Sequence, residues 1–308
     1  MGDDYTGSRG PAGAASGLAS PAPGPPADAP RYTPQWLALR EPADAAARAE
    51  ALLGPLRAYL AGRPPGARLV VRDLGCGTGS MGRWLAPRLP GPQHWILHDH
   101  DPGLLAHAVG AIRGPAAGGG AVTTAAEAGD LALLDADRLA GTSLVTASAL
   151  LDLLTAGEVD ALAAACAEAG CPALLTISVV GRVELDPAEP LDAVLGAAFN
   201  DHQRREHAGR RLLGPGAVAA ARAAFGGRGF AVRTEPSPWR LGPGEAELIA
   251  EWLRGWVGAA CEQRPELAAG GEAYLRRRLG ECAAGRLRVT VWHEDLLALP
   301  GRPAEGGR

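Results

Sequence analysis

The chain has 308 residues, which is enough to bury a full hydrophobic core in one domain or in one domain with a cap. Its formal net charge is −4, so no overall positive field attracts it to nucleic acid or to anionic lipid. All 30 basic residues are arginines, which excludes Schiff-base chemistry on a lysine and the lysine of a P-loop.

Cysteine content and hydropathy indicate the compartment. The five cysteines, an odd number, form neither a disulfide framework nor a C-x-x-C zinc pair. No apolar run reaches the ~18 residues of a membrane span. Asp3 and Asp4 stand where a signal peptide carries positive charge. The sequence therefore predicts a cytoplasmic protein with no membrane partner.

The two ends of the chain differ in composition from its middle. Residues 1–30 are rich in Gly, Ala, Pro and Ser, and we expect a disordered tail because so few apolar side chains cannot offset the entropy of ordering. Residues 31–300 are predicted to fold as one domain, and residues 301–308 to fray. Residues 30–39 are too apolar for a linker and could lie over a ligand cleft. Residues 41–60 carry a leucine stripe that predicts a helix.

A glycine-rich turn between a strand and a helix is the most informative feature. Residues 69–74 are short and rich in β-branched side chains, as in a buried strand, and residues 81–89 follow helical spacing. Gly75, Gly77 and Gly79 lie between them. Without a Cβ they take positive φ and let a ligand approach the unpaired N–H groups at the helix start. This order predicts a nucleotide-cofactor loop.

Two cofactor classes compete for such a loop. Gly77, Gly79 and Gly82 match the dinucleotide fingerprint G-x-G-x-x-G, but read from Gly75 the third glycine falls one residue early. Asp73 favours a cofactor that carries a cationic amino group over a dinucleotide, because a carboxylate at the strand end repels a pyrophosphate and suits such a group. A purely structural tight turn is the remaining interpretation.

The run D-L-G-C-G-T-G, which starts at Asp73, resembles motif I of class I S-adenosylmethionine-dependent methyltransferases. The resemblance implies that S-adenosylmethionine is the cofactor and that Asp73 faces its methionine part. It also implies that the glycines and Cys76 lie beneath the cofactor.

A second acidic strand end lies at Asp99. Residues 95–99 read as a strand, and a carboxylate that accepts from both ribose hydroxyls is expected at this interval after the glycine turn. The run D-x-D-x-x-x-L-x-x-A from Asp99 resembles the family's D-x-S-x-x-x-L-x-x-A, with Asp101 still able to cap a helix. We therefore predict that Asp99 and the adjacent His100 contact the cofactor.

The same cluster could instead hold a metal ion. On a strand, however, His98 and His100 share one face while Asp99 and Asp101 share the other, and no further His or Cys ligand lies nearby. We therefore expect no metal site.

The third and fourth strands carry two further candidates. In the resembled family an acid after the third strand accepts from the adenine amino group, which implies Asp130, with Asp135 or Asp137 as rivals. Ser148 ends the fourth strand, where family members place the methyl acceptor, and is predicted to contact the cofactor.

Strand and helix patterns alternate along the domain. The further predicted strands are residues 121–126, 143–148, 173–180, 230–234 and 287–293. Five β-α repeats in order predict an α/β fold with a doubly wound, mostly parallel sheet. The resemblance implies seven strands with an antiparallel final pair, in a Rossmann-like methyltransferase fold with helical insertions that form a cap.

The first insertion, residues 181–215, is too long for a simple connection and holds a polar cluster on a predicted helix. Insertions at the carboxyl end of a sheet build ligand specificity. We predict that Asn200, Gln203 and Arg204 bind substrate and that His202 is a general base near neutral pH. A solvated helix face is the alternative.

The second insertion, residues 243–285, holds two amphipathic helices. Leu248, Trp252 and Trp256 recur every four residues, which is typical of a core stripe. The insertion could cover the cleft or form a homodimer face. Trp239, just before it, completes the predicted substrate contacts.

The resemblance implies a methyltransferase that moves a methyl group by in-line displacement to an O, N or C nucleophile. Alignment supplies most of the rate in such a reaction, so no catalytic triad is required. No N-P-P-Y-like tetrapeptide follows the fourth strand, which favours a small-molecule acceptor. An RNA or protein acceptor stays open, because Arg204, Arg205, Arg210 and Arg211 could form a basic rim. The alternatives are a nicotinamide-dinucleotide oxidoreductase and a non-catalytic S-adenosylmethionine-binding regulator.

Overall fold

The computed structural model describes residues 32–64, 66–130, 135–207 and 209–301. The tail predicted for residues 1–30 lies outside these ranges, as does the predicted C-terminal tail apart from Gly301. None of the described helices combines the length and the apolar composition needed to cross a bilayer.

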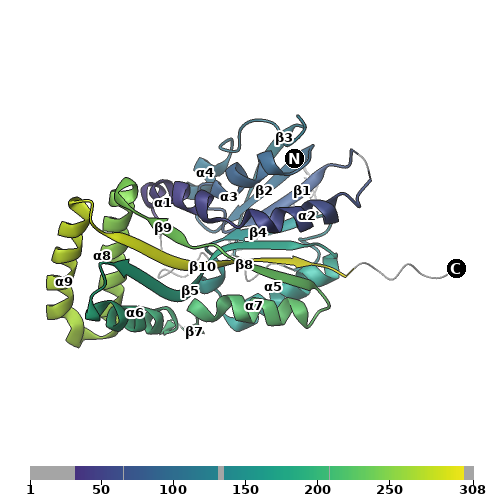
Figure 1. The fold of residues 1–308 in the computed structure, drawn as a ribbon. Coiled ribbons are helices and arrows are strands. Elements are labelled where there is room, and N and C mark those ends of the chain that lie inside the picture. The colour runs from purple at the N-terminus through teal and green to yellow at the C-terminus, as the bar shows by residue number, and fades with distance from the viewer. Residues whose placement is uncertain (1–31, 65, 131–134, 208, 302–308) are drawn as a thin grey trace, which may run out of the picture. The chain divides into compact units, whose positions relative to one another are not determined.

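A mixed sheet forms the centre of the fold, with strand order β3-β2-β1-β4-β5-β10-β8 and with β9 paired to β10 (Figure 1). Strands β1 to β5 pair in parallel, whereas β10 runs antiparallel to β5, β8 and β9. The doubly wound, mostly parallel sheet is confirmed, and β9 is an eighth strand that the sequence patterns did not indicate. The strands are β1 Leu69–Leu74, β2 Gln93–Asp99, β3 Val122–Ala128, β4 Leu144–Ser148, β5 Ala173–Asp186, β8 Ala231–Pro236, β9 Trp239–Leu241 and β10 Arg288–Leu299, with the separate pair β6 Glu206–His207 and β7 Arg210–Arg211.

Helices cover both faces of the sheet. Apolar side chains of α2, α3 and α4 fill one core, and those of α5 and α7 fill the core on the opposite face (Figure 1). The helices are α1 Pro34–Ala47, α2 Leu53–Leu60, α3 Ser80–Leu85, α4 Pro102–Ala108, α5 Ala156–Ala169, α6 Pro190–Gln203, α7 Ala217–Gly226, α8 Ala246–Gln263 and α9 Ala268–Ala283.

The helix predicted for residues 41–60 is two helices, and the first starts earlier. Thr33 caps α1, because its side chain accepts from Trp36 N at 3.2 Å and Pro34 supplies the fixed φ of a first helical position. The helix stops at Arg48, whose φ of −51° and ψ of 131° are not helical. Trp36 therefore lies in the first turn of α1, and Arg48 directly follows its last residue.

The two predicted insertions share a third core. Strand β5 continues to Asp186, well past the predicted end at residue 180, and leads into α6, which packs on α8. Arg278 on α9 is fully buried and joins the two insertions, since its guanidinium binds Asp192 at 2.8 and 3.0 Å and the Pro187 carbonyl at 2.7 Å.

Candidate functional site

The glycine loop has the backbone geometry that a ligand-binding turn requires. Gly75, Gly77 and Gly79 have φ values of +58°, +55° and +86°. A Cβ on Gly75 would lie 2.9 Å from Leu150 Cδ1, and one on Gly77 would lie 3.1 Å from Leu37 Cδ1. The positive φ values therefore favour glycine here, and the ends of the Leu150 and Leu37 side chains lie close to the loop.

Asp99 lies directly against this loop. It ends β2, is 5% exposed, and its Oδ2 accepts from Gly77 N at 2.8 Å while Oδ1 accepts from Asp101 N at 3.0 Å. His100 Nδ1 lies 3.3 Å from Asp99 Oδ1. Asp101 caps α4 as predicted, since its Oδ1 accepts from Gly103 N at 2.7 Å. The ends of β1 and β2 thus bring a carboxylate to the glycines.

Asp73 is a buried acid with one oxygen to spare. Its residue is 0% exposed, and its Oδ1 accepts from Thr146 Oγ1 at 2.8 Å. Its Oδ2 has no hydrogen-bond partner in the described part of the chain. Burial raises the pKa of Asp73 to about 7. A ligand that brought a cationic donor would satisfy Oδ2 and favour the ionised form.

Arg48 is a site residue that the sequence patterns missed. It is 3% exposed, and its Nη2 donates to Ser80 Oγ at 3.2 Å and to Ser148 Oγ at 3.1 Å. The guanidinium lies 5.4 Å from the Trp84 ring centroid. Its Nε and Nη1 have no partner among the described residues, and burial lowers its pKa. The sequence patterns could not indicate it, because α1 ends at Arg48 and the hydrogen-bond partners of Arg48 come from distant segments.

Arg48 and Asp73 together suit an α-amino acid group. Arg48 contacts Ser80 at the start of α3 and Ser148 at the end of β4. Asp73 lies on β1, the strand that pairs with β4. The unpaired donors of one match a carboxylate, and the unpaired oxygen of the other matches an ammonium group. An unsatisfied buried polar group costs about 1–3 kcal/mol, so such a ligand would offset a real penalty. The residues present therefore fit the methionine part of S-adenosylmethionine.

The remaining predicted cofactor residues take different positions. Cys76 is buried within the glycine loop with its thiol 3.6 Å from the Gly77 carbonyl, and burial raises the pKa of the thiol. Asp130 is exposed two residues beyond the end of β3, and residues 131–134 lie outside the described ranges. Its rival Asp135 accepts from Arg138 N at 2.9 Å in its own turn. The adenine contact at Asp130 stays a prediction.

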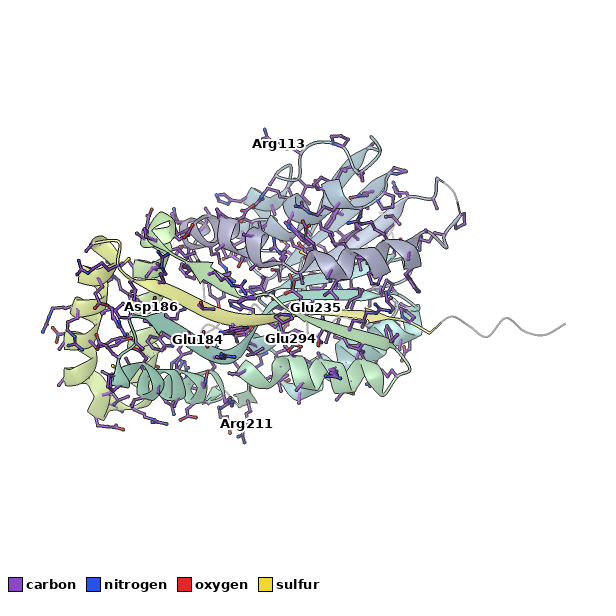
Figure 2. The ribbon with its side chains drawn as sticks, in the orientation of Figure 1. Arg113, Glu184, Asp186, Arg211, Glu235 and Glu294 are labelled. Carbon is purple, nitrogen blue, oxygen red and sulfur yellow. The ribbon has the colours of Figure 1, made fainter. Side chains whose placement is uncertain are left out.

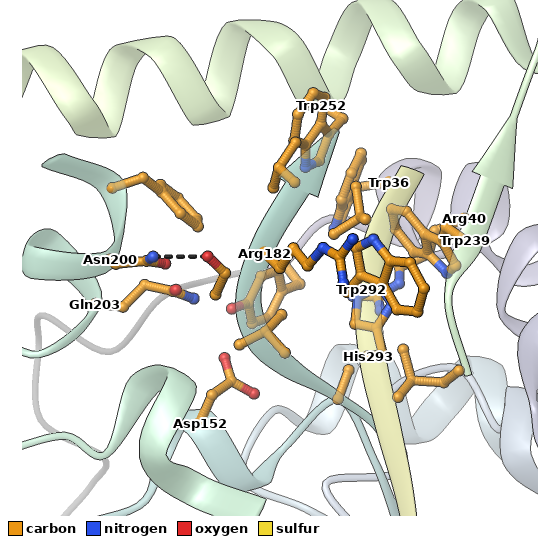
Figure 3. Close-up of a pocket in the computed structure, with 18 residues that line it drawn as sticks. Trp36, Arg40, Asp152, Arg182, Asn200, Gln203, Trp239, Trp252, Trp292 and His293 are labelled. Atoms are coloured by element: carbon orange, nitrogen blue, oxygen red, sulfur yellow. Dashed lines mark hydrogen bonds between the residues drawn. The ribbon is translucent and has the colours of Figure 1, made fainter. Parts of the chain in front are cut away.

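The structure contains a cavity of about 170 Å³ (Figure 3). One of its lining residues is Ala149, which directly follows Ser148. Its walls come from Tyr32 and α1, from the segment after β4 that holds Ala149 and Asp152, and from β5, α6, β9, α8 and β10.

Most of the large side chains in these walls are aromatic. The walls include Asn200, Gln203 and Trp239, three of the predicted substrate residues. The lining side chains with rings or polar groups are Tyr32, Trp36, Arg40, Asp152, Arg182, Phe199, Asn200, Gln203, Trp239, Trp252, Trp292 and His293.

Two residues of this lining hold strained backbone. Ala149 has φ +53° and Ile177 has φ +55°, a region that side-chain-bearing residues rarely occupy. Ile177 N donates to Asp295 Oδ1 at 2.7 Å, and the same carboxylate accepts from Ser237 Oγ and Ala49 N at 2.5 and 2.8 Å. Such strain costs about 1–3 kcal/mol per residue and gathers at functional sites.

His202 and Arg204 are not among the described residues that line the cavity. His202 Nδ1 accepts from Arg205 Nη1 at 2.5 Å, and its Nε2 lies 3.1 Å from Glu262 Oε2 on α8. Burial lowers its pKa. Both ring nitrogens are thus engaged between α6 and α8, which gives no support to the predicted general base. Asn200 does face the cavity, but its amide donates to the Gly181 carbonyl at 2.7 Å.

The predicted basic rim is largely neutralised. Arg210 binds both oxygens of Glu158 at 2.9 Å. Arg205 lies 3.9 Å from Glu262 Oε1, and Arg204 lies 3.9 Å from Asp201 Oδ1. Arg211 projects outward, away from the sheet (Figure 2). An RNA or protein acceptor stays an untested prediction.

No family model and no curated protein sequence matches the chain. Solved structures similar to it include the cyclopropane synthase MmaA2 from Mycobacterium tuberculosis, with 16% identity, 81% of this chain and 84% of that chain covered, and a TM-score of 0.39. A SAM-dependent methyltransferase from Geobacter sulfurreducens, in complex with S-adenosylhomocysteine, has 16% identity, coverage of 87% and 99%, and a TM-score of 0.40. Magnesium protoporphyrin IX methyltransferase from Synechocystis PCC 6803 has 19% identity, coverage of 61% and 76%, and a TM-score of 0.36.

The fold itself is defined by the strand order. A parallel sheet that ends in an antiparallel β10 between β5 and β8, with a glycine loop after β1, is the Rossmann-like fold of class I methyltransferases.

Proposed function

We propose that the chain is an S-adenosylmethionine-dependent methyltransferase with a small-molecule acceptor. The observation that carries this proposal is the pair of unsatisfied groups beside the glycine loop, Asp73 Oδ2 and the Nε and Nη1 of Arg48. A nicotinamide dinucleotide has no amino acid group to satisfy them. Its pyrophosphate would also meet the carboxylates of Asp73 and Asp99.

Asp99 has the capacity for a ribose. Each carboxylate oxygen offers about two lone-pair sites, and Gly77 N and Asp101 N occupy one site on each oxygen. Oδ2 therefore keeps one acceptor site for a ribose hydroxyl, and the second site of Oδ1 is shared with His100 Nδ1, 3.3 Å away, which has to turn aside for the other hydroxyl. Gly77 N also fixes the carboxylate against the loop, so little rotamer entropy is lost on binding.

The bound cofactor supplies a methyl group on a sulfonium centre. Displacement there needs no acid for the leaving group, so the protein's task is to align the acceptor. Ser148 links the two regions: its hydroxyl is held by Arg48, and the next residue, Ala149, lines the aromatic cavity. In this proposal the cavity after β4 receives the acceptor next to the cofactor, at the edge where open α/β sheets bind ligands.

The first test is a calorimetric titration of S-adenosylhomocysteine and, separately, of NADH into the full chain. We expect S-adenosylhomocysteine to bind with 1:1 stoichiometry and NADH to give no heat of binding. The reverse preference would overturn the proposal.

The second test is turnover. Cofactor labelled in its methyl group is incubated with a deproteinised metabolite extract and the chain, and label is expected in a small molecule. Asp99→Ala serves as the inactive control. Binding of S-adenosylhomocysteine with no transfer to any extract, RNA or protein would leave a cofactor-binding regulator instead.

A further inference from the structure

The cavity concentrates the chain's aromatic residues. Four of the seven tryptophans line it, although all aromatic residues together make up only 5% of the sequence. Such a wall presents electron-rich ring faces, which attract organic cations. Its volume of about 170 Å³ is close to that of a ~150 Å³ engineered cavity that holds one benzene molecule. The cavity therefore suits a headgroup of that size rather than a nucleotide.

Two of these rings already bind cations. The Arg40 guanidinium lies 5.0 Å from the Trp239 centroid, and the Arg182 guanidinium lies 4.4 Å from that of Trp292. In the described structure, Trp36 and Tyr32 have no ring or guanidinium stacked on them. Trp36 is half-buried and packs against the third core, so part of its surface is open to a ligand.

The two arginines carry their own counter-ions. Arg40 binds both oxygens of Asp44, at 3.0 and 3.2 Å, and Arg182 Nε binds Glu184 at 2.8 Å. Burial lowers the pKa of His293 to about 4, so this residue is neutral near pH 7. These groups therefore add little net charge to the cavity.

Asp152 is the one carboxylate among the described residues that line the cavity. It lies four residues after the end of β4, and no hydrogen bond from another described side chain reaches it. Burial raises the pKa of Asp152, and the positive charge of Arg40 acts against that rise. Gln203 Oε1 is a buried acceptor without a described partner. Figure 3 shows the Asp152 carboxylate and the Gln203 amide turned toward the same space as Trp252. Trp292 Nε1 is an unpartnered donor in this lining, but the negative charge lies with Asp152.

We propose that this cavity binds an organic ammonium headgroup, with Asp152 as its counter-ion and Trp36, Tyr32 and Trp252 as its aromatic walls. An anion would meet the Asp152 carboxylate and the Gln203 oxygen, and the two guanidiniums of the lining are already bound to the carboxylates of Asp44 and Glu184. That this headgroup belongs to the methyl acceptor rests on the proposed function, whereas the binding itself does not.

The test uses choline and its neutral isostere 3,3-dimethylbutan-1-ol, with isovalerate as the anion of similar shape. Each is titrated into the full chain without cofactor, and tryptophan fluorescence or calorimetry reports binding. We expect choline to bind at least about tenfold more tightly than the alcohol, because a desolvated cation–π contact and a counter-ion favour the charge. Equal affinity for choline and the alcohol, or a preference for isovalerate, would overturn the proposal.

Two variants sharpen the result. Asp152→Asn keeps the shape of the side chain and should remove the preference for choline over the alcohol. Trp36→Leu should weaken choline at least about threefold and provides a second reading if the first variant does not fold. Unchanged choline affinity in both folded variants would contradict the assignment.

Separate titration of S-adenosylhomocysteine distinguishes the two proposals. Binding of the cofactor product without choline selectivity rejects the ammonium site alone. Choline selectivity without binding of S-adenosylhomocysteine rejects the methyltransferase proposal alone.

Discussion

The glycine loop and the aromatic cavity meet at Ser148, and they are built in opposite ways. The loop comes from one contiguous run after β1 and receives a carboxylate from the neighbouring strand end, Asp99. The cavity is assembled from Tyr32, α1, the segment after β4, β5, α6, β9, α8 and β10, which are spread over most of the sequence. A ligand site of the first kind can be predicted from a local motif, whereas one of the second kind exists only once the chain has folded.

The largest effect is expected at Asp99. Asp99→Ala removes the charged acceptor from two ribose hydroxyls, each bond being worth about 1.5–3 kcal/mol, so S-adenosylhomocysteine should bind at least ~100-fold more weakly. Calorimetry measures this. Glu266→Ala, at an exposed site in the second insertion, is the control and should bind normally. Wild-type affinity in folded Asp99→Ala would move the ribose contact elsewhere.

Asp295 forms hydrogen bonds to both the cofactor region and the cavity region, so its replacement tests how much these bonds stabilise the fold. Its carboxylate holds Ala49 N beside Arg48, and Ile177 N and Ser237 Oγ beside the cavity. Asp295→Ala leaves three buried donors unpaired, and we expect the free energy of unfolding to fall by about 3 kcal/mol. Chemical denaturation measures the loss. A free energy of unfolding equal to that of the wild type would show that the three hydrogen bonds of Asp295 do not stabilise the fold.

Arg48 separates the amino acid part of the cofactor site from its nucleoside part. Arg48→Met keeps the apolar stem but removes the donors, so S-adenosylhomocysteine should bind about 10–100-fold more weakly. The matched ligand is 5′-methylthioadenosine, which lacks the amino acid group and should bind the variant as it binds the wild type. Equal weakening of both ligands would make Arg48 a structural residue only.

Asp73 gives the site a pH dependence. Its pKa of about 7 in the folded protein lies above the ordinary value of ~3.9, so the folded state keeps a proton that the unfolded state loses. Asp73 therefore lowers the stability of the unliganded protein as pH rises from about 4 to about 7. A ligand ammonium group prefers the ionised acid, so affinity for S-adenosylhomocysteine should rise about tenfold between pH 5.5 and 7.

Asp73→Asn is the control for this pH effect. The variant should bind with an affinity that is flat over the same pH range, and its stability should lack the fall that Asp73 causes. A pH profile of binding that is identical in the wild type and the variant would show that another group titrates.

Much of the cofactor region could be predicted because its chemistry is local. The strand, the glycine turn and the helix follow one another, and Asp101 caps α4 from its own sequence context. Arg48 could not be assigned in the same way, because its partners Ser80 and Ser148 come from distant segments.

The first insertion shows a limit of a different kind. The composition of a polar cluster on a helix does not show which of its residues face the interior. Asn200 and Gln203, three residues apart, share the face toward the cavity, while His202 turns toward α8. Helical spacing could have predicted which residues face the cavity, since Phe199 and Gln203 are four residues apart and lie on the same side of the helix. The identity of the facing walls, from Trp36 to Trp292, depends on tertiary packing and no local pattern encodes it.

A crystal structure of the full chain with S-adenosylhomocysteine tests the central claim most directly. We expect the carboxylate of the ligand on Arg48, its ammonium group on Asp73 and its ribose hydroxyls on Asp99, with the aromatic cavity left open for an acceptor. S-adenosylhomocysteine bound away from the glycine loop, or lodged in the aromatic cavity itself, would contradict the division of the molecule into a cofactor site and an acceptor site.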